Sequence, residues 1–146
     1  MLKHSFRFIL AACVLATSAS AQVKLCVDAG WQFARQDAAH AWQSVNLPHC
    51  YNALDGVNPD IKYYQGAGWY RTTLQVANPY PGGHTLLEFQ GAGQKTEVYV
   101  DTMLVGTHVG GYDRWTVDIT RYGNGRLPVV VRCDNSRDVQ MIHSDL

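Results

Sequence analysis

Apolar and polar side chains alternate along many short stretches of the chain. Between positions 115 and 120, Trp115, Val117 and Ile119 fall on one side of an extended backbone, and the residues between them are polar. This period of two is typical of a strand with one buried face. No stretch of helical length places its apolar residues at a spacing of 3.6. The alternation predicts strands at 24–33, 43–47, 69–76, 85–90, 96–100, 104–108, 115–119 and 128–134.

These short strands, separated by turn residues, predict an all-β fold: an antiparallel β-sandwich of the jelly-roll type. The alternation also assigns faces. Leu87 and Phe89 are expected inward and Glu88 outward, and Val98 and Val100 are expected inward on the following strand. The side chains expected to be buried or packed at the edge of the core are Trp69, Phe89, Val98, Val100, Trp115, Val117 and Ile119.

Two glycines, Gly110 and Gly111, stand shortly before Trp115. Glycine weakens a strand and is usually placed where φ is positive or where another group packs against the backbone. These two residues therefore favour a tight turn at the start of the strand.

The first residues have the pattern of a secretory signal. Lys3 and Arg7 precede an apolar run at 8–16, and Ala19 and Ala21 have the spacing that suits signal peptidase. We expect residues 1–21 to be removed and the domain at 22–146 to be exported to the periplasm or the extracellular space. Because the run is shorter than the roughly 20 residues that span a bilayer, no membrane span is expected. A lipoprotein signal anchored at Cys13 is the second interpretation of the same residues.

Removal of that segment leaves ten basic and twelve acidic residues, a net charge of −2. The sequence contains no basic run, which argues against nucleic acid or an anionic membrane as the partner. Three cysteines remain, Cys26, Cys50 and Cys133, and an odd number is not a complete disulfide framework. Cys133 shares a face with Val129 and Val131, so we expect it to be a small buried hydrophobe. A bridge between Cys26 and either of the others stays open.

Four longer stretches follow one another along the chain: "WQSVNLPHCYNALDG", "YYQGAGWYRTTLQV", "LLEFQGAGQKTEVYVDTMLVGTHVGGYDRWTVDIT" and "VVVRCDNS". Together, in order and spacing, they resemble the N-terminal sugar-binding domain of glycoside hydrolase family 2, the β-galactosidase and β-glucuronidase group. The resemblance covers nearly all of residues 22–146. It implies a jelly roll in which Gly110 and Gly111 are structural and shape the turn that delivers Trp115 inward.

The resemblance also implies where catalysis takes place. Retaining glycosidases use two carboxyl groups roughly 5 to 5.5 Å apart, and in this family both are glutamates on a separate barrel. The only glutamates here are Glu88 and Glu97, each in an alternating strand and pointing away from the expected core. We therefore expect a chain that is not catalytic by itself. Its histidines and cysteines lack the spacing of a metal site, so no metal or cofactor is expected.

A long irregular stretch at 48–68 interrupts the strand pattern, and loops of this length in compact domains are usually functional or disordered. Its tyrosines argue against disorder. In the enzymes that the chain resembles, this region comes near the sugar-binding pocket of the barrel. Its candidate sugar-binding residues, for a β-galactoside or β-glucuronide, are Asp55, Asn58, Asp60, Tyr63 and Tyr64. The alternative is a loop whose tyrosines only cover the end of the sandwich.

The sequence stops a few residues after "DNS" at 134–136, where the family's domain continues with another strand. We therefore expect the amino-terminal piece of a longer exported hydrolase, with an unpaired sheet edge and the rest of the enzyme as its partner. A free-standing carbohydrate-binding module and an interaction domain without a ligand are the alternatives.

Overall fold

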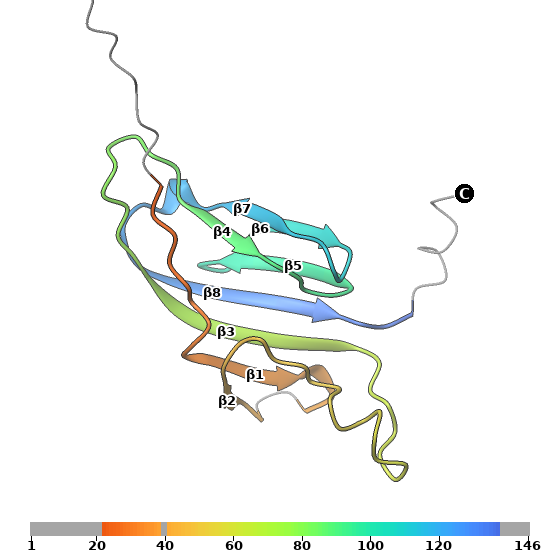
Figure 1. Ribbon diagram of the computed structural model, residues 1–146. Helices are drawn as coiled ribbons and strands as arrows, with labels where there is room; N and C mark the ends of the chain where they lie inside the picture. Colours follow the sequence, from red (N-terminus) through yellow and green to blue (C-terminus); the bar gives the residue numbers. More distant parts are fainter. Residues whose placement is uncertain (1–21, 39–40, 138–146) are drawn as a thin grey trace, which may run out of the picture.

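The computed structural model describes residues 22–38 and 41–137, so the expected signal segment and Cys13 lie outside the described residues. The described chain forms β1 (Trp31–Arg35), η1 (Gln36–Ala38), β2 (Gln43–Val45), β3 (Ala67–Val76), β4 (Leu86–Phe89), β5 (Lys95–Val100), β6 (Met103–Val109), β7 (Trp115–Asp118), η2 (Thr120–Tyr122) and β8 (Gly125–Asp134) (Figure 1). None of its helices is long and apolar enough to cross a membrane.

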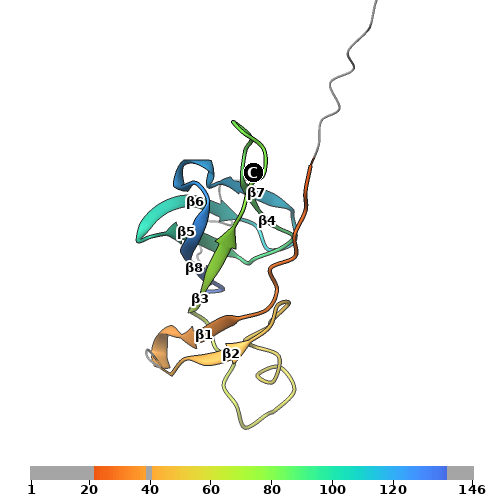
Figure 2. The ribbon, with the colours of Figure 1, turned by 90° about the vertical axis from the view of Figure 1, so that its left-hand side faces the viewer.

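The strands form two antiparallel sheets. The larger sheet has six strands in the order β2-β1-β3-β8-β5-β6, and the smaller sheet pairs β4 with β7. Figure 2 shows the smaller sheet and the long loop between β2 and β3 on the same side of the larger sheet. The predicted all-β antiparallel jelly-roll sandwich is confirmed, and every strand predicted from the alternation overlaps an observed strand.

The start of the first strand differs from the prediction. Alternation predicts a strand from residue 24, whereas β1 begins at Trp31. Gly30 has a φ of +79°, a left-handed conformation that interrupts an extended run. In the segment before Gly30, the carbonyl of Val27 accepts a hydrogen bond from the indole nitrogen of Trp31 at 2.6 Å. The Lys24 ammonium lies 3.0 Å from Glu88 on β4. Residues 22–28 therefore run toward β4 instead of extending β1.

The longest ladder joins β3 to β8 through ten residue pairs, from Ala67 opposite Asp134 to Val76 opposite Gly125. Because β1 pairs with the free side of β3, and β5 with the free side of β8, single rows of side chains cross four strands. The central row is Phe33, Tyr70, Val131 and Val98, and none of these residues is more than 7% exposed.

Two different elements cover this buried face. At the β6 end, a Cβ on Gly106 would lie 2.7 Å from a methyl carbon of Val117, so the missing side chain lets β7 pack closely. At the β1 end, Tyr51 of the long loop stacks on Phe33, with ring centroids 5.4 Å apart. The sandwich is thus closed by strands on one side and by a loop on the other.

Most of the expected core residues are buried or pack against buried ones: Val98, Val100, Val117, Ile119, Phe89 and Trp115. The prediction for Trp69 is wrong. In β3 it is Tyr70 that points into the core, so Trp69 lies on the opposite face, partly buried and beside Arg132. Since both neighbours are aromatic, alternation alone did not decide which of them points inward.

The turn before Trp115 has the structural role that the glycines predict. Gly110 has a φ of +137°, and a Cβ there would lie 2.5 Å from a carboxylate oxygen of Asp113. That carboxylate is hydrogen-bonded to His108 at 3.0 Å. The turn places the Trp115 ring between His108 and Phe89, with centroid distances of 4.8 and 4.6 Å.

The three cysteines of the described chain are free thiols, so no bridge involves Cys26. Cys133 is 7% exposed, which confirms the expectation of a small buried hydrophobe. Burial raises the pKa of its thiol to about 11 and keeps it protonated at neutral pH. Cys26 and Cys50 are exposed.

Replacing Trp115 with alanine is expected to lower the free energy of unfolding by about 3 kcal/mol, because it removes a large aromatic that two other rings sandwich. Urea denaturation of the 146-residue chain measures the change. Tyr112→Ala is the control, since Tyr112 is fully exposed in the same turn and its loss should have almost no effect. Equal midpoints for the two variants would show that Trp115 does not support the core.

Candidate functional site

The long loop between β2 and β3, residues 46–66, is built from successive turns. Backbone amides of Ala53, Asp55, Val57 and Ile61 each donate to the carbonyl three residues earlier, at 3.1 to 3.3 Å. The loop therefore has a defined shape although it contains neither a strand nor a helix.

One side chain from outside the loop fixes its end. Asn135, directly after β8, accepts a hydrogen bond from the amide of Gly66 at 2.8 Å. Its amide nitrogen donates to the Asn52 side chain at 3.0 Å and to the carbonyl of Tyr64 at 3.1 Å. A single partly buried side chain thus joins three points of the loop to the end of the central strand.

A second set of contacts continues inside the loop. One carboxylate oxygen of Asp55 accepts from the Asn52 amide at 2.9 Å and from the backbone amide of Tyr64 at 3.0 Å. The Tyr64 hydroxyl donates to the carbonyl of Ala67 at 2.8 Å, and the Arg35 guanidinium lies 3.8 Å from the centre of its ring. Asp55 and Tyr64 therefore hold the shape of the loop.

Aromatic packing anchors the start of the loop. The hydroxyl of Tyr51 donates to the carbonyl of Gly66 at 3.2 Å while its ring stacks on Phe33. A Cβ at Gly68 would lie 2.7 Å from a ring carbon of Phe33 and 3.1 Å from one of Tyr51, so only glycine leaves room for both rings. His49 packs on Phe33 as well, and burial lowers its pKa.

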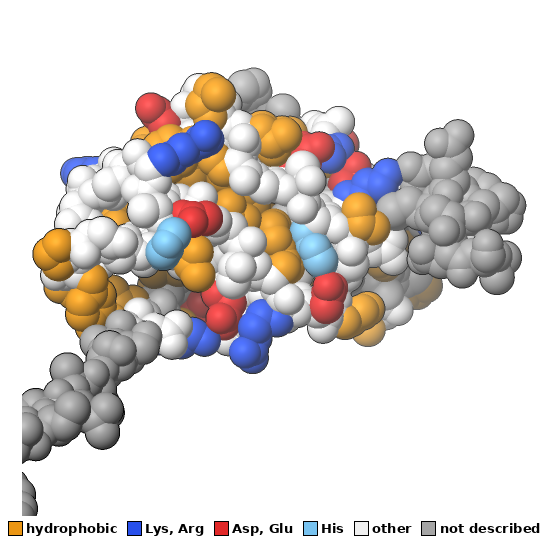
Figure 3. Space-filling view, turned by 90° about the horizontal axis from the view of Figure 1, so that it is seen from above, with side chains coloured by type: hydrophobic (Ala, Val, Ile, Leu, Met, Phe, Trp, Pro, Cys, Tyr) orange, Lys and Arg blue, Asp and Glu red, His pale blue; other side chains and the backbone are white. Residues whose placement is uncertain are grey.

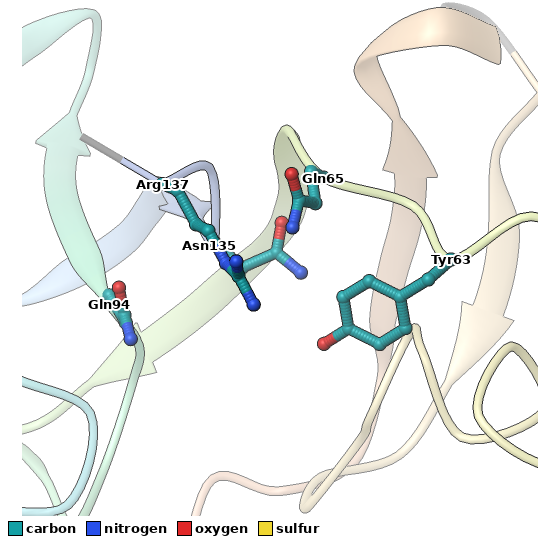
Figure 4. Close-up of a pocket in the computed structure, with 5 residues that line it drawn as sticks. All are labelled: Tyr63, Gln65, Gln94, Asn135 and Arg137. Atoms are coloured by element: carbon teal, nitrogen blue, oxygen red, sulfur yellow. The ribbon is translucent and has the colours of Figure 1, made fainter. Parts of the chain in front are cut away.

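An open pocket of about 430 Å³ lies beside this loop. Figure 4 shows the hydroxyl of Tyr63 pointing across it toward residues that come from other elements. Its lining combines one phenol, three side-chain amides and one guanidinium: Tyr63, Gln65, Gln94, Asn135 and Arg137.

The wall opposite the loop is fixed through its backbone. Gln94 precedes β5, its amide donates to the carbonyl of Asp134 at 2.9 Å, and its carbonyl accepts from the amide of Gly110 at 2.8 Å. The pocket is therefore the meeting point of the long loop, the start of β5 and the residues that follow β8.

Of the candidate residues inferred from the sequence, Tyr63 alone lines this pocket. Asn58 accepts from the amide of Asp60 at 3.0 Å, and both residues are exposed. The structure thus does not gather the five candidates in this one pocket. Sequence reasoning missed Gln65, Gln94, Asn135 and Arg137, and a signal existed only for Asn135, a turn-forming residue that directly follows the last strand.

The comparisons with known proteins agree with this fold. The sequence profile described as "Glycosyl hydrolases family 2, sugar binding domain" matches residues 15–145. The chain belongs to this family. It is 38% identical over 104 residues to a putative β-glucuronidase of Formosa agariphila and 31% identical over 101 residues to a β-glucuronidase of Bacteroides fragilis.

Solved structures of β-glucuronidases contain a part that is similar to this chain in three dimensions. Bacteroides uniformis β-glucuronidase 3 is 47% identical, with a TM-score of 0.75 over 85% of this chain. The β-glucuronidase of Parabacteroides merdae is 44% identical, with a TM-score of 0.71 over 81% of this chain.

The family 2 domain spans only a small part of these relatives. The alignment with the Formosa protein covers 70% of this chain and 13% of that protein. The alignment with the Bacteroides fragilis protein covers 67% of this chain and 14% of that protein. In the two structures the domain corresponds to 20% and 19% of the chain.

The glutamates of this family 2 domain are engaged in separate ion pairs. Glu88 lies 3.0 Å from Lys24 and 3.8 Å from Arg114, and the hydrogen bond from Lys24 lowers its pKa. Glu97 lies 3.8 Å from Arg132 and accepts from the Tyr99 hydroxyl at 2.8 Å. The two glutamates stand on strands of different sheets. Among residues 22–38 and 41–137, no group of three or more histidine, cysteine or acidic side chains could hold a metal ion.

Asn135→Ala is expected to release the loop, because it removes one acceptor and two donor contacts at once. Hydrogen exchange at the amides of Gly66 and Tyr64 should become faster by at least about tenfold, which corresponds to 1.4 kcal/mol. Asn124→Ala is the matched control, since Asn124 makes two comparable bonds to Asn78 in a different loop. If both variants leave exchange in residues 46–66 unchanged, Asn135 does not hold the loop.

Proposed function

We propose that the chain is the N-terminal sugar-binding domain of a longer, exported family 2 glycoside hydrolase that acts on β-galactosides or β-glucuronides. The names of the relatives support this proposal, since those described above are β-glucuronidases and others with 29% to 31% identity are β-galactosidases. The small share of each relative that the domain covers supports a part within a larger enzyme.

The observation that carries the proposal is the composition of the pocket beside the long loop. A sugar offers hydroxyl groups on its rim and C–H groups on its ring faces, so it is bound by amides and charged groups together with an aromatic surface. The pocket combines three amides and a guanidinium with Tyr63, whose residue surface is 50% exposed. We assign direct sugar contact to Tyr63, Gln65, Gln94 and Arg137, whereas Asn135 shapes the pocket because its amide group is already bonded to the loop.

The other candidates receive different roles in this proposal. Asp55 and Tyr64 position Tyr63, because their hydrogen bonds fix the backbone on which it stands. Asn58 and Asp60 lie exposed on the same loop and are available to the more distant parts of a glycoside.

The domain is proposed to bind without catalysing. A retaining mechanism needs one carboxyl group with a raised pKa and a second one roughly 5 to 5.5 Å away. Glu88 instead has a lowered pKa beside Lys24, and Glu97 belongs to the other sheet. The catalytic carboxyl groups are therefore assigned to the rest of the enzyme.

Charged side chains of both signs are interspersed with hydrophobic ones on the face of the molecule seen in Figure 3.

Export rests on the basic and apolar pattern of residues 1–21. Secreted protein from a bacterial host is expected to begin at Gln22, which intact-mass measurement of the exported chain detects. A mass that retains the first residues, or one that shows a lipid on Cys13, would contradict cleavage after Ala21.

Tyr63→Ala is expected to weaken binding of phenyl β-glucuronide or phenyl β-galactoside to the 146-residue chain about tenfold, because the pocket loses its aromatic surface. Titration followed by NMR measures the affinity. Tyr80→Ala is the control, since Tyr80 is 38% exposed and follows the opposite end of β3. Equal affinity of both variants and the parent would move the sugar site away from this pocket, and no binding by the parent would favour an interaction domain.

A further inference from the structure

The pocket beside the long loop has a lining with a single formal charge. Four of its five lining side chains are a phenol and three amides, which are neutral, and the fifth is the guanidinium of Arg137. An arginine side chain stays protonated at every pH at which proteins are normally folded. Among the described residues that line the pocket, none is an aspartate or a glutamate. The lining is therefore positively charged.

The carboxylate that ends β8, directly before the pocket, has other partners. One oxygen of Asp134 accepts from the Arg132 guanidinium at 2.6 Å, and the other accepts from the backbone amide of Ser136 at 2.9 Å. Within residues 22–38 and 41–137, no aspartate or glutamate forms an ion pair with Arg137. The guanidinium of Arg137 is thus available to a ligand.

The loop side of the pocket does not cancel this charge. Asp55 accepts two hydrogen bonds with one of its carboxylate oxygens, both from groups within the loop. Asp60 is exposed and stands two positions before Lys62, which is also exposed, so their charges offset each other. A ligand in the pocket therefore meets Arg137 as the main charge.

The position of Arg137 suits recognition of an anionic group. Its side chain is exposed and reaches from the residues that follow β8 to the space between Gln94 and Tyr63 (Figure 4). A guanidinium presents several N–H groups in a planar fork that matches the oxygens of a carboxylate or an ester of an oxyacid. Hydrogen bonds between two charged groups are roughly twice as strong as those between neutral ones. A sugar hydroxyl gains only the weaker kind.

We propose that this pocket selects sugars that carry an anionic group, a carboxylate or a sulfate ester, over neutral sugars, and that Arg137 determines this specificity. The inference rests on the proposed function, in which the same pocket contacts the sugar of a galactoside or a glucuronide. In this arrangement Tyr63 lies against a face of the sugar ring and Gln65 and Gln94 bond its hydroxyl groups. Arg137 bonds the anionic substituent.

The test compares three ligands of the 146-residue chain by titration followed by NMR: phenyl β-galactoside, phenyl β-glucuronide and phenyl β-galactoside 6-sulfate. We expect at least one anionic ligand to bind about tenfold more tightly than the neutral one, because hydrogen bonds to charged groups contribute more. This advantage should shrink when NaCl is raised from about 50 to about 500 mM, since exposed charges are screened by salt.

Three variants assign the preference to one residue. Arg137→Gln removes the charge but keeps a hydrogen-bonding side chain, so it should weaken the anionic ligand about tenfold more than the galactoside. Arg137→Lys keeps the charge and should keep most of the preference. Arg126→Gln is the matched control, since Arg126 is exposed at the opposite end of β8, and it should change each affinity by less than about twofold.

The outcomes separate this inference from the proposed function. A parent chain that binds none of the three ligands contradicts the proposed function and removes the basis of the inference. Equal affinity of the parent for all three overturns the charge preference and leaves the proposed function standing. A preference that survives Arg137→Gln, or that Arg126→Gln reduces equally, overturns the role of Arg137. A preference for one anionic ligand alone supports the inference and identifies the carboxylate or the sulfate as the recognised group.

Discussion

The ladder between β3 and β8 is the constraint on which the rest of the molecule depends. Its ten residue pairs fix the register of β3 against β8. The other edge of β3 pairs with β1, and the other edge of β8 pairs with β5. A shift of one residue would turn every side chain of a strand to the other face. The same register sets the position at which β8 ends, and therefore places Asn135 opposite Gly66. The packing of the core and the positions of the loop and the pocket thus all depend on the register of β3 against β8.

The size of the side chains along the central row matches the two elements that cover it. Beneath β7 the row holds valine and then Gly106, and the close approach of Val117 fills the space. Beneath the loop it holds Tyr70 and Phe33, which Tyr51 covers. The backbone of an irregular loop offers little apolar surface, so large aromatic rings are needed at this end of the row to bury enough apolar area.

The sequence predicted the strands well because alternation is a local property that every half-buried strand displays. It did not distinguish Trp69 from Tyr70, since neighbouring aromatics satisfy either phase of the alternation. It also extended β1 too far, because Val23, Leu25 and Val27 alternate correctly in a segment that does not pair. Of the residues that line the pocket beside the long loop, Tyr63 was among the sugar-binding candidates inferred from the sequence, whereas Gln94 and Asn135 were not. Asn52 and Asn135 are separated by 83 positions, and only the folded chain brings them together.

The backbone of Gln94 is fixed between Asp134 on one side and Gly110 on the other. Nearby, a Cβ on Gly93 would lie 2.6 Å from the Cα of Gly111, so the two chain segments touch through their main chains. Nothing in this arrangement depends on which side chain position 94 carries. The pocket therefore has one wall whose position is set by the main chain, so an exchange of the side chain at position 94 is expected to alter the chemistry of that wall without altering its geometry.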